Sequence, residues 1–199
     1  MQPFIGKVIV MGGSAGALDA LGRVLPQLSR DFPLPIAMVL HVPPGSPSHL
    51  AEVLGAKCAL LVKEAEDKEP LAPSTLYVAP PNYHLLIEPR RCLSLSVDEP
   101  VLFSRPSIDV LFESAADALG PNAIGVLLTG ASADGARGLD RIANAGGITL
   151  VQTPQSSSVS VMPEAALRMN PNHRALSPTE IGAALAQLGR DERKAAEAS

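Results

Sequence analysis

The feature that most constrains the fold is the alternation of short apolar runs with segments patterned as helices. Residues 7–11 ("KVIVM") and 36–40 ("IAMVL") are short and almost wholly apolar, which predicts strands buried on both faces. Between them, residues 18–28 place Leu18, Leu21, Leu25 and Leu28 on one helical face. Strands that alternate with helices form a mainly parallel sheet covered on both sides. We therefore predict an α/β fold with a doubly wound, mainly parallel sheet.

The rest of the chain continues this pattern as one domain over residues 1–189, followed by a polar tail over residues 190–199, which reads as a solvated helix end or a frayed tail. We expect further strands at residues 60–62, 123–130 and 148–152, and further helices within residues 43–57 (capped by Ser46 or Ser48), from Ser107 through Leu119, after Asp134, and near Pro163 and Pro178. Three runs at residues 76–79, 85–87 and 93–97 are short and closely spaced. They predict a local meander or hairpin, a small antiparallel addition to the parallel sheet.

Composition excludes several classes of protein. The net charge is −4, aromatic residues make up 3% of the chain and Trp is absent, so neither a phosphate-binding basic surface nor a base-stacking surface is expected. No segment approaches the roughly 20 apolar residues of a membrane span. Cys58 and Cys92 stand in apolar contexts without metal-site spacing, and we expect them to pack as small hydrophobic residues. These observations predict a cytoplasmic protein with no nucleic-acid partner, no membrane insertion and no metal or organic cofactor.

A turn of small residues follows the first strand, and its sequence admits two functions. Residues 12–16 ("GGSAG") fit the nucleophile elbow G-x-S-x-G, with Ser14 as the nucleophile. The same turn, at the start of a helix, is also suited to binding a phosphate or another anion. A dinucleotide fingerprint would need Gly at position 14, and a phosphate-binding Walker loop would need a Gly-Lys-Ser/Thr sequence that the chain lacks.

Three chemically distinct side chains follow three predicted strands. Ser14 comes after the first strand, His41 directly after the second, and Asp134 shortly after the strand at residues 123–130. Since the carboxyl ends of parallel strands share one edge of the sheet, a hydroxyl, an imidazole and a carboxylate are expected there together. That set is the one a Ser-His-Asp hydrolase requires. Taken singly, each has a structural alternative: Ser14 as a helix-start or anion contact, His41 as a core histidine, and Asp134 as a turn residue or cap.

The other histidines are weaker candidates for a general base. His49 lies in a helix pattern, His84 in the predicted meander and His173 in the polar turn "NPNHR".

The chain resembles the catalytic domain of the chemotaxis protein-glutamate methylesterases, bacterial enzymes that demethylate chemoreceptors. The resemblance extends from Lys7 to about Leu188 and rests on six blocks in the family's order: "VIVMGGSAGALDAL", "VLHVPPGSPSHLAEVL", "LYVAPPNYHLLI", "SRPSIDVLFESAA", "GVLLTGASADGARGL" and "QSSSVSVMPEAAL". The first, second and fifth blocks carry the family's active site.

This resemblance implies a doubly wound, mainly parallel sheet with an antiparallel edge, and it implies roles for individual residues. Ser14 matches the nucleophile, His41 the general base and Asp134 the acid of the triad, with backbone N–H groups of Ala15 and Ala131 as expected oxyanion donors. The implied reaction is hydrolysis of glutamate methyl esters on a methylated chemoreceptor or related signalling protein, with glutamine deamidation at the same site. No cofactor is implied.

The chain departs from the family pattern at three places around this site. Ala15 stands where family members commonly have Thr, "TGASADG" replaces the usual "TGMGxDG", and Val161 precedes Met162-Pro163 where Gly is common. Loss of the Met and gain of Ser132 are expected to change the wall of the cleft, and with it the substrate preference.

Regulation and two rival functions complete the expectations. Relatives commonly carry a receiver domain before the catalytic domain, whereas seven residues precede Val8. We therefore expect a stand-alone catalytic domain, controlled by localisation or by a separate regulatory protein. One rival is a catalytically weak interaction module that keeps the methylesterase fold. The other is a nucleotide-phosphate site at residues 12–16. Two features argue against it: position 14 is not glycine, and position 41 is not acidic.

Overall fold

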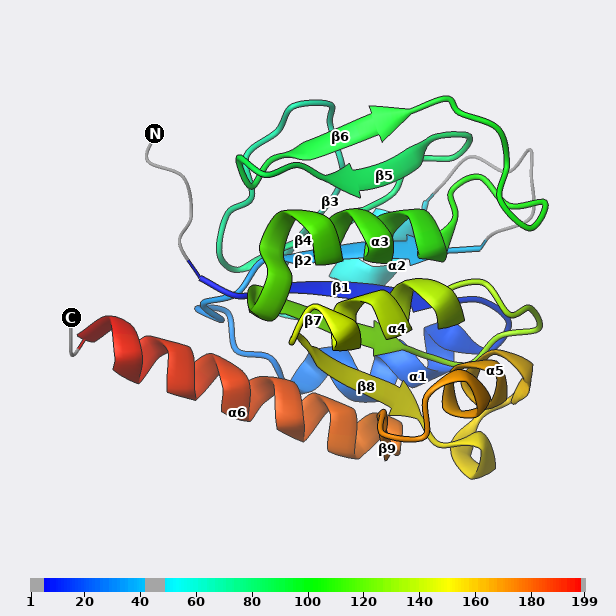
Figure 1. Cartoon of the computed structure of the whole chain (residues 1–199). Coiled ribbons are helices and arrows are strands. Elements are labelled where there is room, and N and C mark those ends of the chain that lie inside the picture. The colour runs from blue at the N-terminus through cyan, green and yellow to red at the C-terminus, as the bar shows by residue number, and fades with distance from the viewer. Residues whose placement is uncertain (1–5, 42–48, 198–199) are drawn as a thin grey trace.

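The computed structural model describes residues 6–41 and 49–197 and contains one large parallel sheet (Figure 1). Within these residues the sheet has seven strands in the order β3-β4-β2-β1-β7-β8-β9, and every neighbouring pair is parallel. Its strands are β1 (Val8–Gly13), β2 (Ile36–Leu40), β3 (Leu61–Glu64), β4 (Thr75–Val78), β7 (Ala123–Leu127), β8 (Ile148–Gln152) and β9 (Arg174–Leu176). The predicted α/β fold with a mainly parallel sheet is confirmed.

Helices cover both faces of the sheet, as the doubly wound pattern requires. They are α1 (Ala17–Val24), α2 (Leu50–Gly55), α3 (Ile108–Leu119), α4 (Ala136–Asn144), α5 (Val161–Met169) and α6 (Pro178–Glu197), with short 3-10 turns η1 (Leu25–Gln27), η2 (Gly120–Asn122) and η3 (Pro154–Ser156). One core cluster joins the sheet to α3, α4 and α5, and a second joins its other face to α1, α2 and α6.

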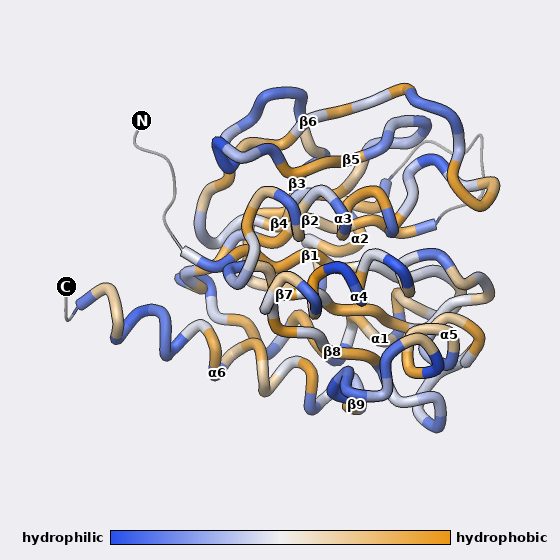
Figure 2. The backbone as a smooth tube through the Cα atoms, viewed as in Figure 1, coloured by the Kyte–Doolittle hydropathy of each residue, from blue (hydrophilic) through white to orange (hydrophobic). Residues whose placement is uncertain are grey.

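Strand β1 shows how the sequence produces this layering. Its side chains alternate between the two clusters: Val8 and Val10 belong to the α3–α4 side, and Ile9 and Met11 belong to the α1–α6 side. All four are fully buried, so the strand needs apolar residues on both faces. Figure 2 shows the central strands in hydrophobic colours, whereas α6 alternates between hydrophobic and hydrophilic along its length.

The helices differ in detail from the expected bounds. The helix expected over residues 18–28 is regular only as far as Val24, and the chain continues as the turn η1. Pro26 explains the change, because proline has no N–H to donate and interrupts an α-helix interior. Helix α2 begins at Leu50, and the expected caps Ser46 and Ser48 lie outside the described residues. Helix α6 runs without interruption through residue 197.

The expected meander is partly wrong. Residues 76–79 were expected to belong to it, but Thr75–Val78 forms β4, a fully buried strand between β3 and β2 in the parallel sheet. Its backbone pairs in parallel with β2 on one side and with β3 on the other, and helices cover both faces of the sheet there, which suits its apolar residues. The other two runs form an antiparallel hairpin of β5 (His84–Ile87) and β6 (Leu93–Ser96). It is a separate two-stranded sheet that packs on α3, not an antiparallel edge of the large sheet (Figure 1).

The strand order places the topological switch between β1 and β7. From β1 the chain moves outward through β2 toward one edge, and from β7 it moves outward through β8 to the other edge. Ligands of doubly wound sheets bind beyond the carboxyl ends of the strands at this point. The loops after β1, β2 and β7 therefore define the candidate site.

Candidate active site

Ser14 and His41 extend the ends of two paired strands. Gly13 pairs with Leu40 in the β1–β2 register, so Ser14 and His41 are the next residues along each strand. The His41 N–H donates to Gly13 O at 3.1 Å, and the Ser14 N–H donates to Thr129 O at 2.9 Å on the other side. These backbone bonds hold Ser14 between the His41 strand and the loop after β7.

Asp134 binds the imidazole of His41. Its Oδ2 lies 2.8 Å from His41 Nε2, although the two residues are far apart in sequence. The Asp134 side chain is completely buried, and that of His41 retains 15% exposure. Of the three residues expected to form a triad, the structure brings this pair into contact. Ser14 Oγ has no hydrogen-bond partner among the described residues.

The Asp134 carboxylate is surrounded by hydrogen-bond donors from the start of α3. Oδ1 accepts from Ser107 Oγ at 2.8 Å and from the Asp109 N–H at 2.9 Å, and Oδ2 accepts from the Ile108 N–H at 2.8 Å. Burial by itself raises the pKa of Asp134, but the hydrogen bonds from His41 and from α3 outweigh it and hold that pKa below the ordinary value of 3.8. Asp134 is thus an ionised acceptor.

The charge of Asp134 fixes the tautomer of His41. An ionised carboxylate can only accept a hydrogen bond, so His41 Nε2 carries the proton that lies between them. In the neutral imidazole, Nδ1 is then left with a free lone pair. This assigns the role of proton acceptor to Nδ1, the ring nitrogen that does not face Asp134.

Two of the residues that hydrogen-bond to Asp134 were not predicted to have a role at the site. Ser107 was expected as the cap of α3, and its Oγ does accept from the Val110 N–H at 3.5 Å, but its hydroxyl proton points to Asp134. Asp109 was not singled out at all. It is buried, and its Oδ1 accepts from the Gly135 and Gly138 N–H groups at 3.0 and 2.8 Å. A single Asp in the first turn of a helix gives no sequence signal for a cap on another helix.

Ala15 and Ala131, the expected oxyanion donors, are exposed residues in the loops that follow β1 and β7. Neither N–H has an acceptor among the described residues. Thr129 ties the two loops together: its Oγ1 donates to Ala15 O at 3.0 Å and lies 2.9 Å from Val159 O. This buried threonine therefore sets the spacing of the loops that carry both N–H groups.

Gly130 and Met162, which adjoin the departures at Ala131 and Val161, lie against each other, and the departure at Ser132 makes a local hydrogen bond. Met162 is fully buried beneath Gly130: a Cβ on that glycine would lie 2.6 Å from Met162 Cε and 3.0 Å from Ser14 Cβ. Ser132 Oγ accepts from the Asp134 N–H at 3.3 Å, a local bond that helps to form the turn before Asp134.

None of the other three histidines, all of them within the described residues, hydrogen-bonds directly to Ser14, His41 or Asp134. His49 is exposed and pairs with Glu52, whereas His173 is buried and bonds Thr149 Oγ1 through Nδ1 at 2.9 Å. His84 is also buried, and its contacts lead indirectly to Asp134.

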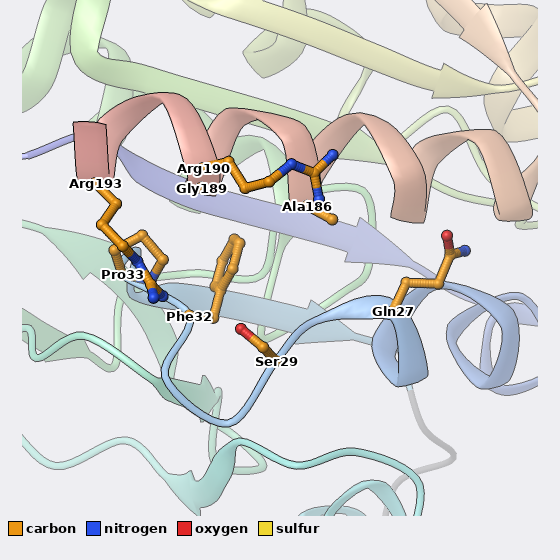
Figure 3. Close-up of a pocket in the computed structure, with 8 residues that line it drawn as sticks. All are labelled: Gln27, Ser29, Phe32, Pro33, Ala186, Gly189, Arg190 and Arg193. Carbon is orange, nitrogen blue, oxygen red and sulfur yellow. The ribbon is translucent and has the colours of Figure 1, made fainter. Parts of the chain in front are cut away.

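A cavity elsewhere on the molecule is lined by charged side chains that already have partners. It measures about 90 Å³ and lies between α6 and the segment that enters β2, at the opposite end of the sheet from Ser14 (Figure 3). Its two arginines are already engaged, Arg193 by Asp31 and Arg190 by Gln187. Within residues 6–41 and 49–197, no group of three or more His, Cys, Asp or Glu side chains is arranged to hold a metal ion, and no helix has the length and hydropathy for a membrane span.

The family model described as CheB methylesterase matches residues 9–185. The chain belongs to the CheB methylesterase family. The solved catalytic domain of the Thermotoga maritima CheB methylesterase superposes with a TM-score of 0.88 at 31% identity, covering 92% of this chain and 99% of that domain. The predicted resemblance and fold are thereby confirmed.

Named relatives agree with this assignment. The protein-glutamate methylesterase FrzG of Myxococcus xanthus is 42% identical over 90% of this chain and 54% of its own length. A Leptospira interrogans protein, whose name gives methylesterase and glutaminase activities provisionally, is 45% identical over 81% of this chain and 83% of its own length. A Geobacter metallireducens protein-glutamate methylesterase/protein-glutamine glutaminase is 37% identical. The chain spans about half the length of the Myxococcus and Geobacter relatives.

Proposed function

We propose that this chain hydrolyses glutamate methyl esters on a chemoreceptor-like signalling protein, with Ser14, His41 and Asp134 as its catalytic triad. The observation that carries the proposal is the 2.8 Å contact of His41 with the buried, ionised Asp134, one strand away from Ser14. The names of the relatives support the reaction and the substrate class.

The reaction begins when His41 Nδ1 takes the hydroxyl proton of Ser14. Ser14 Oγ bonds to the ester carbonyl carbon, and the carbonyl oxygen becomes an oxyanion. Backbone N–H groups of Ala15 and Ala131 donate to this oxygen, because their protons have no acceptor among the described residues. Asp134 stabilises the imidazolium that forms on His41.

Collapse of the tetrahedral intermediate breaks the bond to the methoxy oxygen, which leaves as methanol with the proton from His41. Water then gives a proton to His41 and attacks the acyl-enzyme. The bond to Ser14 Oγ breaks, Ser14 recovers its proton, and the glutamate carboxylate is released. Glutamine deamidation follows the same steps, with ammonia as the first leaving group.

Ser14 and His41 follow paired residues of neighbouring strands, Gly13 in β1 and Leu40 in β2. Catalytic hydrogen bonds are often long or unformed in substrate-free enzymes and form in the complex with substrate. The missing Ser14–His41 bond is consistent with this behaviour.

Methanol release from a methylated receptor segment tests the proposal. The wild-type chain is expected to release methanol and to be labelled by a fluorophosphonate probe at Ser14, while Ser14→Ala does neither. Labelling at another residue, or equal methanol release by Ser14→Ala, would overturn the proposed mechanism. A wild-type chain that releases no methanol would overturn the proposed reaction.

A further inference from the structure

The small β5–β6 hairpin carries a buried histidine that contacts Ser107, one of the residues that hydrogen-bond to Asp134. His84 is the first residue of β5 and is 1% exposed. Its Nδ1 lies 3.2 Å from the Ser107 backbone N, and its Nε2 lies 3.1 Å from Glu99 O. Both ring nitrogens therefore have partners from the segment that leads into α3.

These partners determine the protonation of His84. A backbone N–H can only donate, so Nδ1 must be the acceptor for Ser107, and a carbonyl oxygen can only accept, so Nε2 must donate to Glu99. The ring is a neutral bridge with one tautomer. It holds the main chain of Ser107 on one side and the main chain of Glu99 on the other.

Ser107 connects this bridge to the active site. Its N–H binds His84, and its hydroxyl donates to Asp134 Oδ1 at 2.8 Å. Asp134 Oδ2 in turn binds His41. A continuous path of hydrogen bonds thus runs from the hairpin through Ser107 and Asp134 to the imidazole of His41.

We propose that His84 is a positioning residue for the reaction: through Ser107 it fixes the carboxylate of Asp134, and thereby the orientation of His41. This role rests on the proposed triad. It also gives a reason for the packing of this hairpin against α3, since β5 carries the ring to Ser107, the N-cap residue of this helix.

Two substitutions separate the acceptor role of His84 from its bulk. His84→Phe fills the space but leaves the buried Ser107 N–H without an acceptor. His84→Asn places an amide oxygen close to the position of Nδ1 and restores that acceptor. We expect His84→Phe to lower kcat on the order of 10²-fold with little change in KM, because small displacements of catalytic groups have effects of this size. His84→Asn should recover most of the loss.

His173→Phe is the matched control. His173 is 4% exposed and also bonds a neighbour through Nδ1, but its partner is Thr149 in β8, which is not one of the site residues. We expect this variant to lose stability and to keep kcat, once rates are divided by the fraction of molecules that a fluorophosphonate probe labels. Equal losses of kcat in His84→Phe and His173→Phe would overturn the proposal, as would a failure of His84→Asn to exceed His84→Phe.

A measurement without substrate tests the same inference independently of the proposed function. The Nε2 proton of His41, shared with Asp134, is followed by proton and nitrogen NMR in the intact chain. We expect its resonance to shift or broaden in His84→Phe, to return toward the wild-type position in His84→Asn, and to stay unchanged in His173→Phe. An unchanged resonance in His84→Phe would overturn the positioning role, whether or not the wild-type chain hydrolyses methyl esters.

Discussion

Asp134 binds the start of α3, the helix that contains Asp109, and Asp109 binds the start of α4, the helix that follows Asp134. Asp134 Oδ1 accepts from the Asp109 N–H in α3 at 2.9 Å, and Asp109 Oδ1 accepts from the Gly135 N–H, directly after Asp134, at 3.0 Å. Both carboxylates are buried at helix N-termini, where the backbone N–H groups favour negative charge. This reciprocal arrangement fixes α3 and α4 to each other at the site.

Burial makes Asp109 the less readily ionised of the two. Loss of water raises the pKa of Asp109, and the nearby charge of Asp134 adds to this, against the opposing hydrogen bond from Gly138 and the charge of Arg137. Asp134, by contrast, is the carboxylate that pairs with His41. The two acids therefore have different tasks although they share one set of helix ends.

Removal of Asp109 should damage stability more than its neutralisation does. Asp109→Ala leaves the Gly135 and Gly138 N–H groups buried without an acceptor, and each such group costs about 1–3 kcal/mol. Asp109→Asn keeps an oxygen for both. We expect urea unfolding to show a loss of about 2–5 kcal/mol for the Ala variant and a much smaller loss for the Asn variant. Equal losses would mean that the charge, not the acceptor, stabilises the helix ends.

The triad should behave as a unit. Ser14→Ala and His41→Ala are each expected to lower kcat by about 10⁴-fold or more, and the double variant should be hardly slower, because either change alone abolishes the same nucleophilic step. Near-additive losses in the double variant would contradict a shared step. Methanol release under saturating substrate gives the comparison.

Asp134→Asn should lower kcat by about 10³–10⁴-fold. The amide can donate to Nε2, which favours the tautomer with its proton on Nδ1, and that proton blocks the acceptor that Ser14 needs. Circular dichroism should show an intact fold. Normal turnover in this variant would exclude Asp134 from the mechanism.

The sequence could place the candidate site in the fold because strand ends are visible in it. Buried runs at residues 7–11 and 36–40 identify two strands, and parallel strands place the next residues, Ser14 and His41, side by side. The 2.8 Å contact of Asp134 with His41 agrees with that expectation. Chemistry carried by residues that directly follow strands is thus accessible to pattern reasoning.

The supporting residues were not accessible in the same way. His84 lies in the segment predicted as a meander or hairpin, but its contact with Ser107 joins segments whose approach no local pattern encodes. β4 was misplaced for a related reason: a short apolar run gives no indication of whether its partner is parallel or antiparallel. The contact between His84 and Ser107 forms only because α3 packs against the hairpin, and a local sequence pattern does not predict that packing.

Acid should lower the activity without protonating Asp134. The proposed general base accepts the Ser14 proton only in its neutral form, so kcat/KM is expected to decline in acid. The pKa of Asp134 lies below 3.8, so this carboxylate stays ionised throughout the decline. A plot of log kcat/KM against pH should have an acid slope of about one. A slope near two would indicate that Asp134 titrates in the same range, and a rate that does not change with pH would exclude His41 as the base.

His173 should make the folded chain less stable in mild acid. Burial lowers the pKa of His173 below 6.5, and the charge of Asp140 offsets only part of that effect. As pH falls below 6.5, His173 becomes protonated in the unfolded chain but stays neutral in the folded chain. The free energy of unfolding therefore decreases. The decrease ends once pH passes below the folded-state pKa, where both states are protonated.

His173→Asn cannot titrate, but it keeps a polar atom near Thr149. Urea unfolding at pH 7.5 and pH 5.0, conditions chosen about the ordinary imidazole pKa, should show a smaller loss of stability in the variant. Loss of the ring itself changes the free energy of unfolding by the same amount at both pH values, so it cancels when the two measurements are subtracted. An identical pH dependence in both proteins would show that His173 titrates normally in the folded chain.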